Sequence, residues 1–171
     1  MRLSRSFFSR DVLDVAPDLL GKTLKRNFDN NTLQLTITET EAYRGEDDLG
    51  CHASKGRTPR TEVMYHKGGL VYVYLIYGMH WLLNFTTGYE GHPQAVLIRG
   101  TAQVQGPGRI GRDLKLDKSF YGEDLVTSER LWLEDSPDFE TKQEILTSPR
   151  IGIDYAGELW AGKHWRFRLC F

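Results

Sequence analysis

The sequence predicts one compact domain, residues 1–171, that combines β-hairpins with a few short helices. A chain of 171 residues, 40% hydrophobic and 26% charged, can bury one full core. Two pairs of strand-like segments are each joined by a short turn, which is the pattern of antiparallel hairpins. Helical spacing is confined to short segments, and no internal repeat, low-complexity tract or linker divides the chain.

The chain begins with a basic segment that leads into a short helix. Arginines lie among the serines of residues 1–10, a composition that faintly resembles a transit peptide. We favour a basic arm of the domain, because the helical pattern of residues 11–21 follows without a spacer. In that helix Pro17 suits a first helical position and Gly21 suits a stop.

Residues 32–43 carry the clearest strand pattern. Leucine or isoleucine occupies every second position from 33 to 37, as in a strand with one face on a core. Residues 23–26 precede it across an Asn30-Asn31 turn, so the two segments form a hairpin.

Two carboxylates continue this central strand. If the pleat is unbroken, Glu39, Glu41 and Tyr43 keep the inward parity of the apolar residues. A carboxylate that leaves water has either a function or a strong partner. A surface strand end, where glutamates are ordinary, is the alternative.

A long glycine-rich segment, residues 44–69, follows the strand and is expected to be a functional or mobile loop. Its acidic patch at residues 45–48 is expected to be solvated. The basic residues of the same segment, which could hold phosphates locally, are Lys55, Arg57, Arg60 and Lys67.

The most aromatic segment predicts a second hairpin, with strands near 70–76 and 80–86. Its turn should carry Tyr77, Met79 and His80 outward, while Tyr72 is assigned to the core. An exposed tyrosine and methionine at a tip are hard to explain as core residues.

A further strand, residues 94–99, ends abruptly in Arg99. That guanidinium either reaches solvent or meets an inward carboxylate. Residues 106–112 open a helix that runs through Leu116, and its arginines are either solvated or near a phosphate bound by the backbone amides. The remaining segments are expected to be structural, with strands near 131–133, 144–147 and 165–169 and a segment at 150–153.

Several classes of protein are disfavoured. The glycine-rich segments match neither a Walker A loop nor a dinucleotide turn, and the histidines and cysteines lack metal-site spacing, so neither cofactor nor metal is expected. A net charge of −1 gives no bulk attraction to polyanions. No apolar run approaches the roughly 18 residues that span a bilayer. Two distant cysteines indicate a reducing compartment. We expect a soluble, cytoplasmic protein.

Motifs spread over nearly the whole chain resemble the alkyladenine (3-methyladenine) DNA glycosylase family. The resemblance implies a single-domain α+β fold with a curved antiparallel β-sheet, surrounding short helices and a protruding β-hairpin. It also implies a monofunctional repair enzyme that flips a damaged purine out of duplex DNA and hydrolyses its N-glycosidic bond. The motifs are Glu39-Thr-Glu-Ala-Tyr43, His52, Gly56-Arg-Thr-Pro-Arg60, Met64, Tyr72-Val-Tyr-Leu-Ile-Tyr-Gly-Met79, Asn84, Val96-Leu-Ile-Arg99, Gly106-Pro-Gly108 and Pro149-Arg-Ile-Gly152.

The resemblance assigns roles to individual residues. Glu41 matches the general base that activates a water, and Arg99 matches an arginine beside that water. Tyr77 matches the wedge that fills the gap left in the base stack. Asn84 matches a residue that discourages guanine. The pocket walls, which stack on and hydrogen-bond the flipped base, match Tyr43, His52 and Tyr74.

The implied partner is double-stranded DNA that contains alkylated or deaminated purines, such as 3-methyladenine or hypoxanthine. We expect a monomer without a membrane partner, associated with the nucleoid if the source is bacterial. A non-catalytic module that captures a modified purine, with Glu41 only as a hydrogen-bond acceptor, is the alternative function.

Overall fold

β2 (Thr32–Tyr43) is the strand around which the sheet is arranged. In the computed structural model, which describes residues 1–137, 139 and 143–170, β1 (Thr23–Asn27) pairs with the first half of β2. β5 (Gln94–Thr101) pairs with the second half, and β8 (Arg166–Leu169) pairs with the other edge of that half. Two neighbouring strands therefore lie against the stretch of β2 that carries the glutamates.

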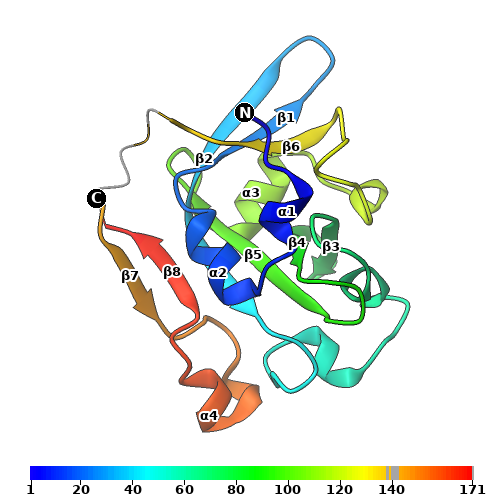
Figure 1. The fold of residues 1–171 in the computed structure, drawn as a ribbon, viewed down its shortest axis with the longest axis vertical. Coiled ribbons are helices and arrows are strands. Elements are labelled where there is room, and N and C mark those ends of the chain that lie inside the picture. The colour runs from blue at the N-terminus through cyan, green and yellow to red at the C-terminus, as the bar shows by residue number, and fades with distance from the viewer. Residues whose placement is uncertain (138, 140–142, 171) are drawn as a thin grey trace.

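The sheet is antiparallel and curls into a half barrel (Figure 1). Within the described ranges it has eight strands, in the order β3-β4-β5-β2-β1-β6, with β8 and then β7 attached to β2. The strands not yet named are β3 (Val71–Ile76), β4 (His80–Thr87), β6 (Leu131–Glu134) and β7 (Ile145–Ser148).

Short helices complete a single α+β domain, as predicted. α2 (Val12–Asp18) packs on β2 and β5, and α3 (Pro107–Asp113) packs on β4 and β5. α1 (Arg5–Phe8) and α4 (Gly157–Ala161) lie near the two ends of the chain. No helix of the described part of the chain is both long and apolar enough to cross a membrane.

The predicted strands are all present, with ends that differ by at most two residues. The expectation for Pro17 is wrong, because this proline lies in the last turn of α2, one residue before the helix ends. The N-terminus of α2 is instead capped by Asp11, whose carboxylate accepts from the Leu13 amide. α3 is also shorter than expected, since it ends at Asp113.

The pleat of β2 is broken shortly after Ile37. The register against β5 shifts twice there, as at a β-bulge. Ile37 packs in the main core, but beyond the shifts Ala42 is the residue that reaches this core. The expectation of unbroken parity is therefore wrong, and the alternation places Glu39, Glu41 and Tyr43 on the face opposite Ala42.

Residues 44–69 are more ordered than a glycine-rich loop suggests. They contain two short 3₁₀ helices, His52–Lys55 and Glu62–Tyr65. Apolar side chains of this segment form a second, smaller core that packs against Leu70, Tyr72 and Ala95. The segment is therefore anchored to the sheet, and the expected loop contains two short helices.

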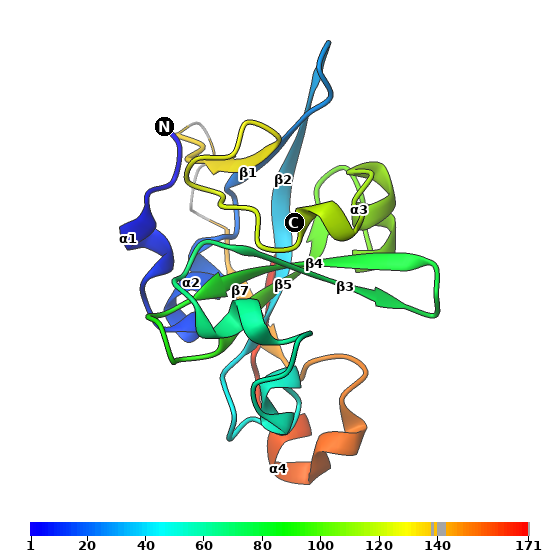
Figure 2. The same cartoon turned by 90° about the vertical axis from the view of Figure 1, so that its right-hand side faces the viewer.

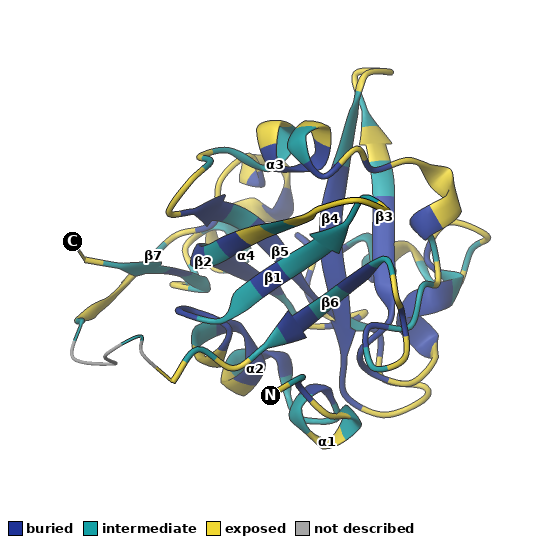
Figure 3. Cartoon of the chain, turned by 90° about the horizontal axis from the view of Figure 1, so that it is seen from above, coloured by how far each residue is buried: buried dark blue, intermediate teal, exposed yellow. Residues whose placement is uncertain are grey.

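The β3–β4 hairpin projects beyond the body of the domain (Figure 2), and its tip is exposed while its base is buried (Figure 3). Tyr77 is 89% exposed and Met79 is 69% exposed. Tyr77 and Gly78 have φ angles of 51° and 65°, the sign pattern of a type I′ turn. A bulky residue such as tyrosine rarely adopts a positive φ, so the tip holds Tyr77 outward in a strained conformation.

Candidate active site

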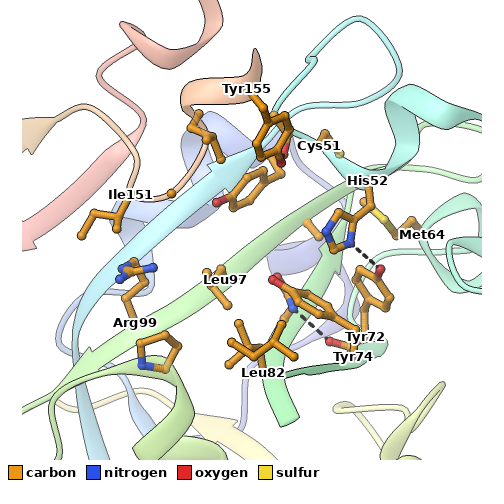
Figure 4. Close-up of a pocket in the computed structure, with 18 of the residues that line it drawn as sticks. Cys51, His52, Met64, Tyr72, Tyr74, Leu82, Leu97, Arg99, Ile151 and Tyr155 are labelled. Carbon is orange, nitrogen blue, oxygen red and sulfur yellow. Dashed lines mark hydrogen bonds between the residues drawn. The ribbon is translucent and has the colours of Figure 1, made fainter. Parts of the chain in front are cut away.

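A cavity of about 400 Å³ opens between the β3–β4 hairpin and the chain segments at 50–52 and 151–155. Pockets of about 300–1,000 Å³ are usual for small-molecule sites. In Figure 4, Arg99 lies at one end of the cavity, His52 and Met64 lie at the other, and Tyr155 lies at the rim. Side chains from most of the chain's length meet here, which is why the cavity exists only in the folded protein.

Aromatic rings form one wall of the cavity. The His52 ring meets Tyr74 edge-on, with 4.6 Å between ring centroids, and the Tyr72 and Tyr74 centroids are 5.4 Å apart. His52 Nδ1 and the Tyr72 hydroxyl share a hydrogen bond of 2.8 Å. Such a wall suits a flat ring, because aromatic faces attract one another and attract cations. Tyr72 is buried, as assigned, but it also lines this cavity.

Burial keeps these rings uncharged at neutral pH. Desolvation, reinforced by Arg60 and Lys55, lowers the pKa of His52 to about 4. Desolvation, reinforced by the charge of Glu41, raises the pKa of Tyr74 to about 12 and that of Tyr43 well above its usual range. His52 is therefore a neutral imidazole, which makes it a weak proton donor at pH 7.

Glu41 is fully buried and lies behind the residues that line the cavity, without lining it itself. Arg99 Nη1 lies 3.0 Å from its Oε1, the Ile151 amide donates to Oε2 at 3.2 Å, and the Tyr43 hydroxyl donates to Oε2 at 3.3 Å. All three partners line the cavity, so they connect the carboxylate to it. Desolvation raises the pKa of Glu41 in spite of Arg99, the Ile151 amide and the other donors. A carboxylate with a raised pKa is a stronger base than one in water.

Arg99 and Asn84 come from the neighbouring strands β5 and β4. The sequence left open whether the Arg99 guanidinium reaches solvent or meets a carboxylate, and in the structure it forms an ion pair with Glu41. Asn84 is buried, and its Nδ2 donates to the Tyr72 carbonyl at 3.2 Å, which fixes the amide in the cavity wall.

Asp48 and Arg150 form a buried ion pair that sequence reasoning missed. Both side chains are fully buried, and Arg150 Nη1 lies 2.6 Å from Asp48 Oδ2. The other guanidinium nitrogen donates to Asp48 Oδ1 at 2.8 Å, and the guanidinium carbon lies 4.8 Å from the centroid of the Tyr43 ring. The expectation of a solvated acidic patch is therefore wrong for Asp48. The pair secures the segment whose Ile151 amide meets Glu41.

The basic residues of the segment 44–69 are partly compensated. Arg57 pairs with Glu62 at 2.7 Å, and Lys67 lies 3.3 Å from Asp124. Arg60 lies over the Tyr74 ring with its guanidinium 5.0 Å from the centroid. The positive charge available to a phosphate on this side is therefore smaller than the count of basic residues suggests.

The structure brings the predicted site residues together around one cavity. Glu41 lies beneath it, and the lining includes Tyr43, His52, Tyr74, Tyr77, Asn84 and Arg99. The residues that sequence reasoning assigned to structure or solvent are Asp48, Tyr72, Arg150 and Ile151. The sequence offered little to identify them. Tyr72 lies on the same face of its predicted strand as Tyr74, which could have placed it at the site. No local pattern of residues indicates that Asp48 pairs with Arg150. Among the described residues, no group of three or more His, Cys, Asp or Glu side chains could share a metal ion.

A buried carboxylate behind an aromatic slot, next to a projecting hairpin, makes a site that suits a planar ring. Comparison of sequences identifies the enzyme class. The chain belongs to the methylpurine-DNA glycosylase family, whose sequence model matches residues 6–105 and 100–170. The resemblance seen in the motifs is thereby confirmed, and the protein is a hydrolase of N-glycosyl bonds that acts on alkylated bases of DNA in DNA repair.

Relatives extend over almost the same length. A protein of Natranaerobius thermophilus is 41% identical, with 99% of this chain and 96% of the relative covered. A protein of Methanocella arvoryzae is 42% identical (96% and 90% covered), and one of Wolbachia pipientis is 43% identical (98% and 90% covered). All three are described, by inference, as 3-methyladenine DNA glycosylases.

Proposed function

We propose that the cavity takes up a purine flipped out of damaged duplex DNA and that Glu41 activates the water that attacks C1′ of its deoxyribose. The carboxylate takes a proton from the water, the C1′–N bond breaks, and its electron pair leaves with the base. An abasic site remains. The negative charge of Glu41 also stabilises the positive charge that develops on the sugar, as in other glycosidic cleavages.

The burial and hydrogen bonding of Glu41 carry this proposal. A carboxylate can accept about four hydrogen bonds. The Ile151 amide and the Tyr43 hydroxyl supply two, and Arg99 adds an ion-pair contact of 3.0 Å, so the carboxylate has acceptor capacity left for a water. Its raised pKa strengthens it as a base, while the Arg99 guanidinium favours the ionised form.

The pocket favours purines that already carry a positive charge. 3-Methyladenine in DNA is a cation at the purine ring, so it leaves without prior protonation, and the tyrosines attract it by about 0.5–2 kcal/mol. Hypoxanthine is neutral and needs a proton on the leaving base. His52, whose pKa is about 4, donates that proton poorly at pH 7. We therefore expect faster release of 3-methyladenine than of hypoxanthine.

Tyr77 is proposed to fill the gap in the base stack when the purine leaves it. Its exposure of 89% and its place at the cavity rim support this role.

The protein is proposed to act as a monomer in the cytoplasm. The free cysteines, Cys51 and Cys170, suit a reducing compartment.

Release of free base from duplex DNA tests the proposal. Duplexes with one 3-methyladenine or hypoxanthine are incubated with the protein in excess chelator, and free base and alkali-labile sites are measured. Glu41→Gln should reduce release by about 10²–10⁴-fold while duplex binding persists. Glu134→Gln, a matched change on the remote strand β6, should leave release unchanged.

Two outcomes would count against the mechanism. Binding of the lesion without release of base by the wild-type protein would support a non-catalytic reader. Undiminished release by Glu41→Gln would assign the base to another residue.

A further inference from the structure

The site contains two more charged residues, Glu39 and Arg166, that none of the proposed steps uses. Glu39 precedes Glu41 by two positions on β2, and Arg166 lies directly opposite Glu41 in the β2–β8 pairing. Arg166 Nε donates to Glu39 Oε1 at 2.5 Å. The sequence assigned the β8 segment only a structural role.

These residues and the Glu41–Arg99 pair form one charge row, Arg166–Glu39–Arg99–Glu41. Arg99 Nε lies 3.6 Å from Glu39 Oε1, while its Nη1 lies 3.0 Å from Glu41 Oε1. Positive and negative groups alternate along the row, and the four charges sum to zero. The side chains are at most 18% exposed, so water screens them little.

The local backbone is built to hold this row. The register shifts against β5 fall on either side of Glu39, but the pairing with β8 is regular from Glu39 to Glu41, so these two glutamates share one face of the strand. Gly100 follows Arg99, and a Cβ at Gly100 would lie 2.7 Å from Gln105 Oε1, 3.1 Å from the Glu39 Cβ and 3.3 Å from the Glu39 Oε2. The lack of a side chain at Gly100 therefore leaves room for Glu39 beside Arg99.

Because Glu39 and Glu41 share Arg99, the basicity of the Glu41 carboxylate is affected. An arginine devoted to one carboxylate holds that carboxylate in its ionised form and weakens it as a base. Because Glu39 also attracts Arg99, the hold on Glu41 is reduced. Glu39 is also paired with Arg166, which offsets part of the attraction of Glu39 for Arg99.

We propose that Glu39 and Arg166 are positioning residues that set the basicity of Glu41 through Arg99. This role rests on the proposed function of Glu41 and deepens it. Other groups also act on Glu41. The charged or titratable groups that face it from neighbouring strands and segments are Glu39 and Tyr43 on β2, Tyr74 on β3, Arg99 on β5, Arg150 and Arg166. Arg99 and Arg166 both favour the ionised form of Glu41 by their charge, and the effect of Arg99 is the larger.

The test measures the ionisation of Glu41 in two independent ways. The first is the ¹³C NMR titration of its side-chain carboxyl in the free protein, assigned by its absence in Glu41→Gln. The second is the pH dependence of single-turnover release of 3-methyladenine. The NMR titration needs no activity, so failure of this inference is distinguishable from failure of the proposed function.

The two neutralising variants should shift the titration in opposite directions. Arg166→Met removes positive charge, so the Glu41 titration and the acidic limb of the rate should move to higher pH. Glu39→Gln removes the competitor, so both should move to lower pH, and the rate at pH 7 should fall about tenfold, within the coupling expected inside one ion-pair network.

Two controls separate this role from a general loss of structure. Arg166→Lys keeps the charge and should restore the wild-type titration. Lys25→Met breaks a comparable cross-strand pair with Glu134, which is 2.8 Å long and remote from the cavity, and should shift nothing. An unchanged Glu41 titration in both neutralising variants, or shifts in the same direction, would overturn the inference.

Discussion

Replacement of Arg150 by methionine should be among the most destabilising single changes in this protein. The guanidinium and its partner Asp48 are fully buried, and two hydrogen bonds of 2.6 and 2.8 Å join them. Arg150→Met leaves the Asp48 carboxylate buried without its counter-charge. Breaking such a pair costs about 3–5 kcal/mol. For a domain of this size, a loss of that magnitude lowers Tm by about 6–20 °C.

Thermal unfolding at pH 7 measures this loss, with a surface pair as control. Arg10 pairs with Asp18 at 2.7 Å, but both side chains are more than a third exposed, so Arg10→Met should cost at most about 1 kcal/mol. The double variant Asp48→Asn/Arg150→Met removes the orphan charge. The Arg44 and Gly50 backbone amides donate to the two separate oxygens of Asp48, and the side-chain oxygen of the asparagine can still accept from one of them. It should therefore be more stable than Arg150→Met alone, with a coupling of about 0.5–3 kcal/mol.

Arg150→Met should also impair base release, because Arg150 directly precedes Ile151, whose backbone amide donates to Glu41. The reasoning would be refuted by a Tm of Arg150→Met no lower than that of Arg10→Met. Additive losses in the double variant would equally show that the buried charge is not what destabilises the single one.

Three further outcomes follow from the site. Burial raises the pKa of Glu41 above its usual value near 4.5, so the ionised carboxylate destabilises the fold at higher pH. In calorimetry, Glu41→Gln should therefore have a Tm at pH 8 equal to or above that of the wild type, and the difference should vanish below pH 4.5. A Glu41→Gln variant that is less stable than the wild type at pH 8 would contradict this. The His52 ring should titrate near pH 4 in ¹⁵N NMR, and titration near its ordinary 6.5 would mean that it is not desolvated. Tyr77→Ala should weaken engagement of duplex lesions by about 1–3 kcal/mol, the worth of a stacked aromatic, with less effect on single-stranded substrate; equal losses on both would argue against a wedge.

Local sequence patterns were enough to predict the strands and the hairpin tip. Alternation at residues 33–37 and the aromatic run before Gly78 each depend on side chains close together in the chain, so their structures follow from local preferences and burial. Motif spacing was equally informative for the family, because its residues keep their order along the chain. The ion pair of Arg99 with a carboxylate was one of two outcomes that the sequence left open.

The sequence by itself thus determined the strands, the family and the predicted residues that gather around the cavity. Only the tertiary structure decided which of the charged side chains are buried and which of them form ion pairs. The break in the pleat of β2 turned Glu41 away from the main core and beneath the cavity, and chain folding joined Asp48 to Arg150 across 102 residues. Such contacts depend on distance in space and on the exclusion of water, neither of which a local pattern of residues encodes.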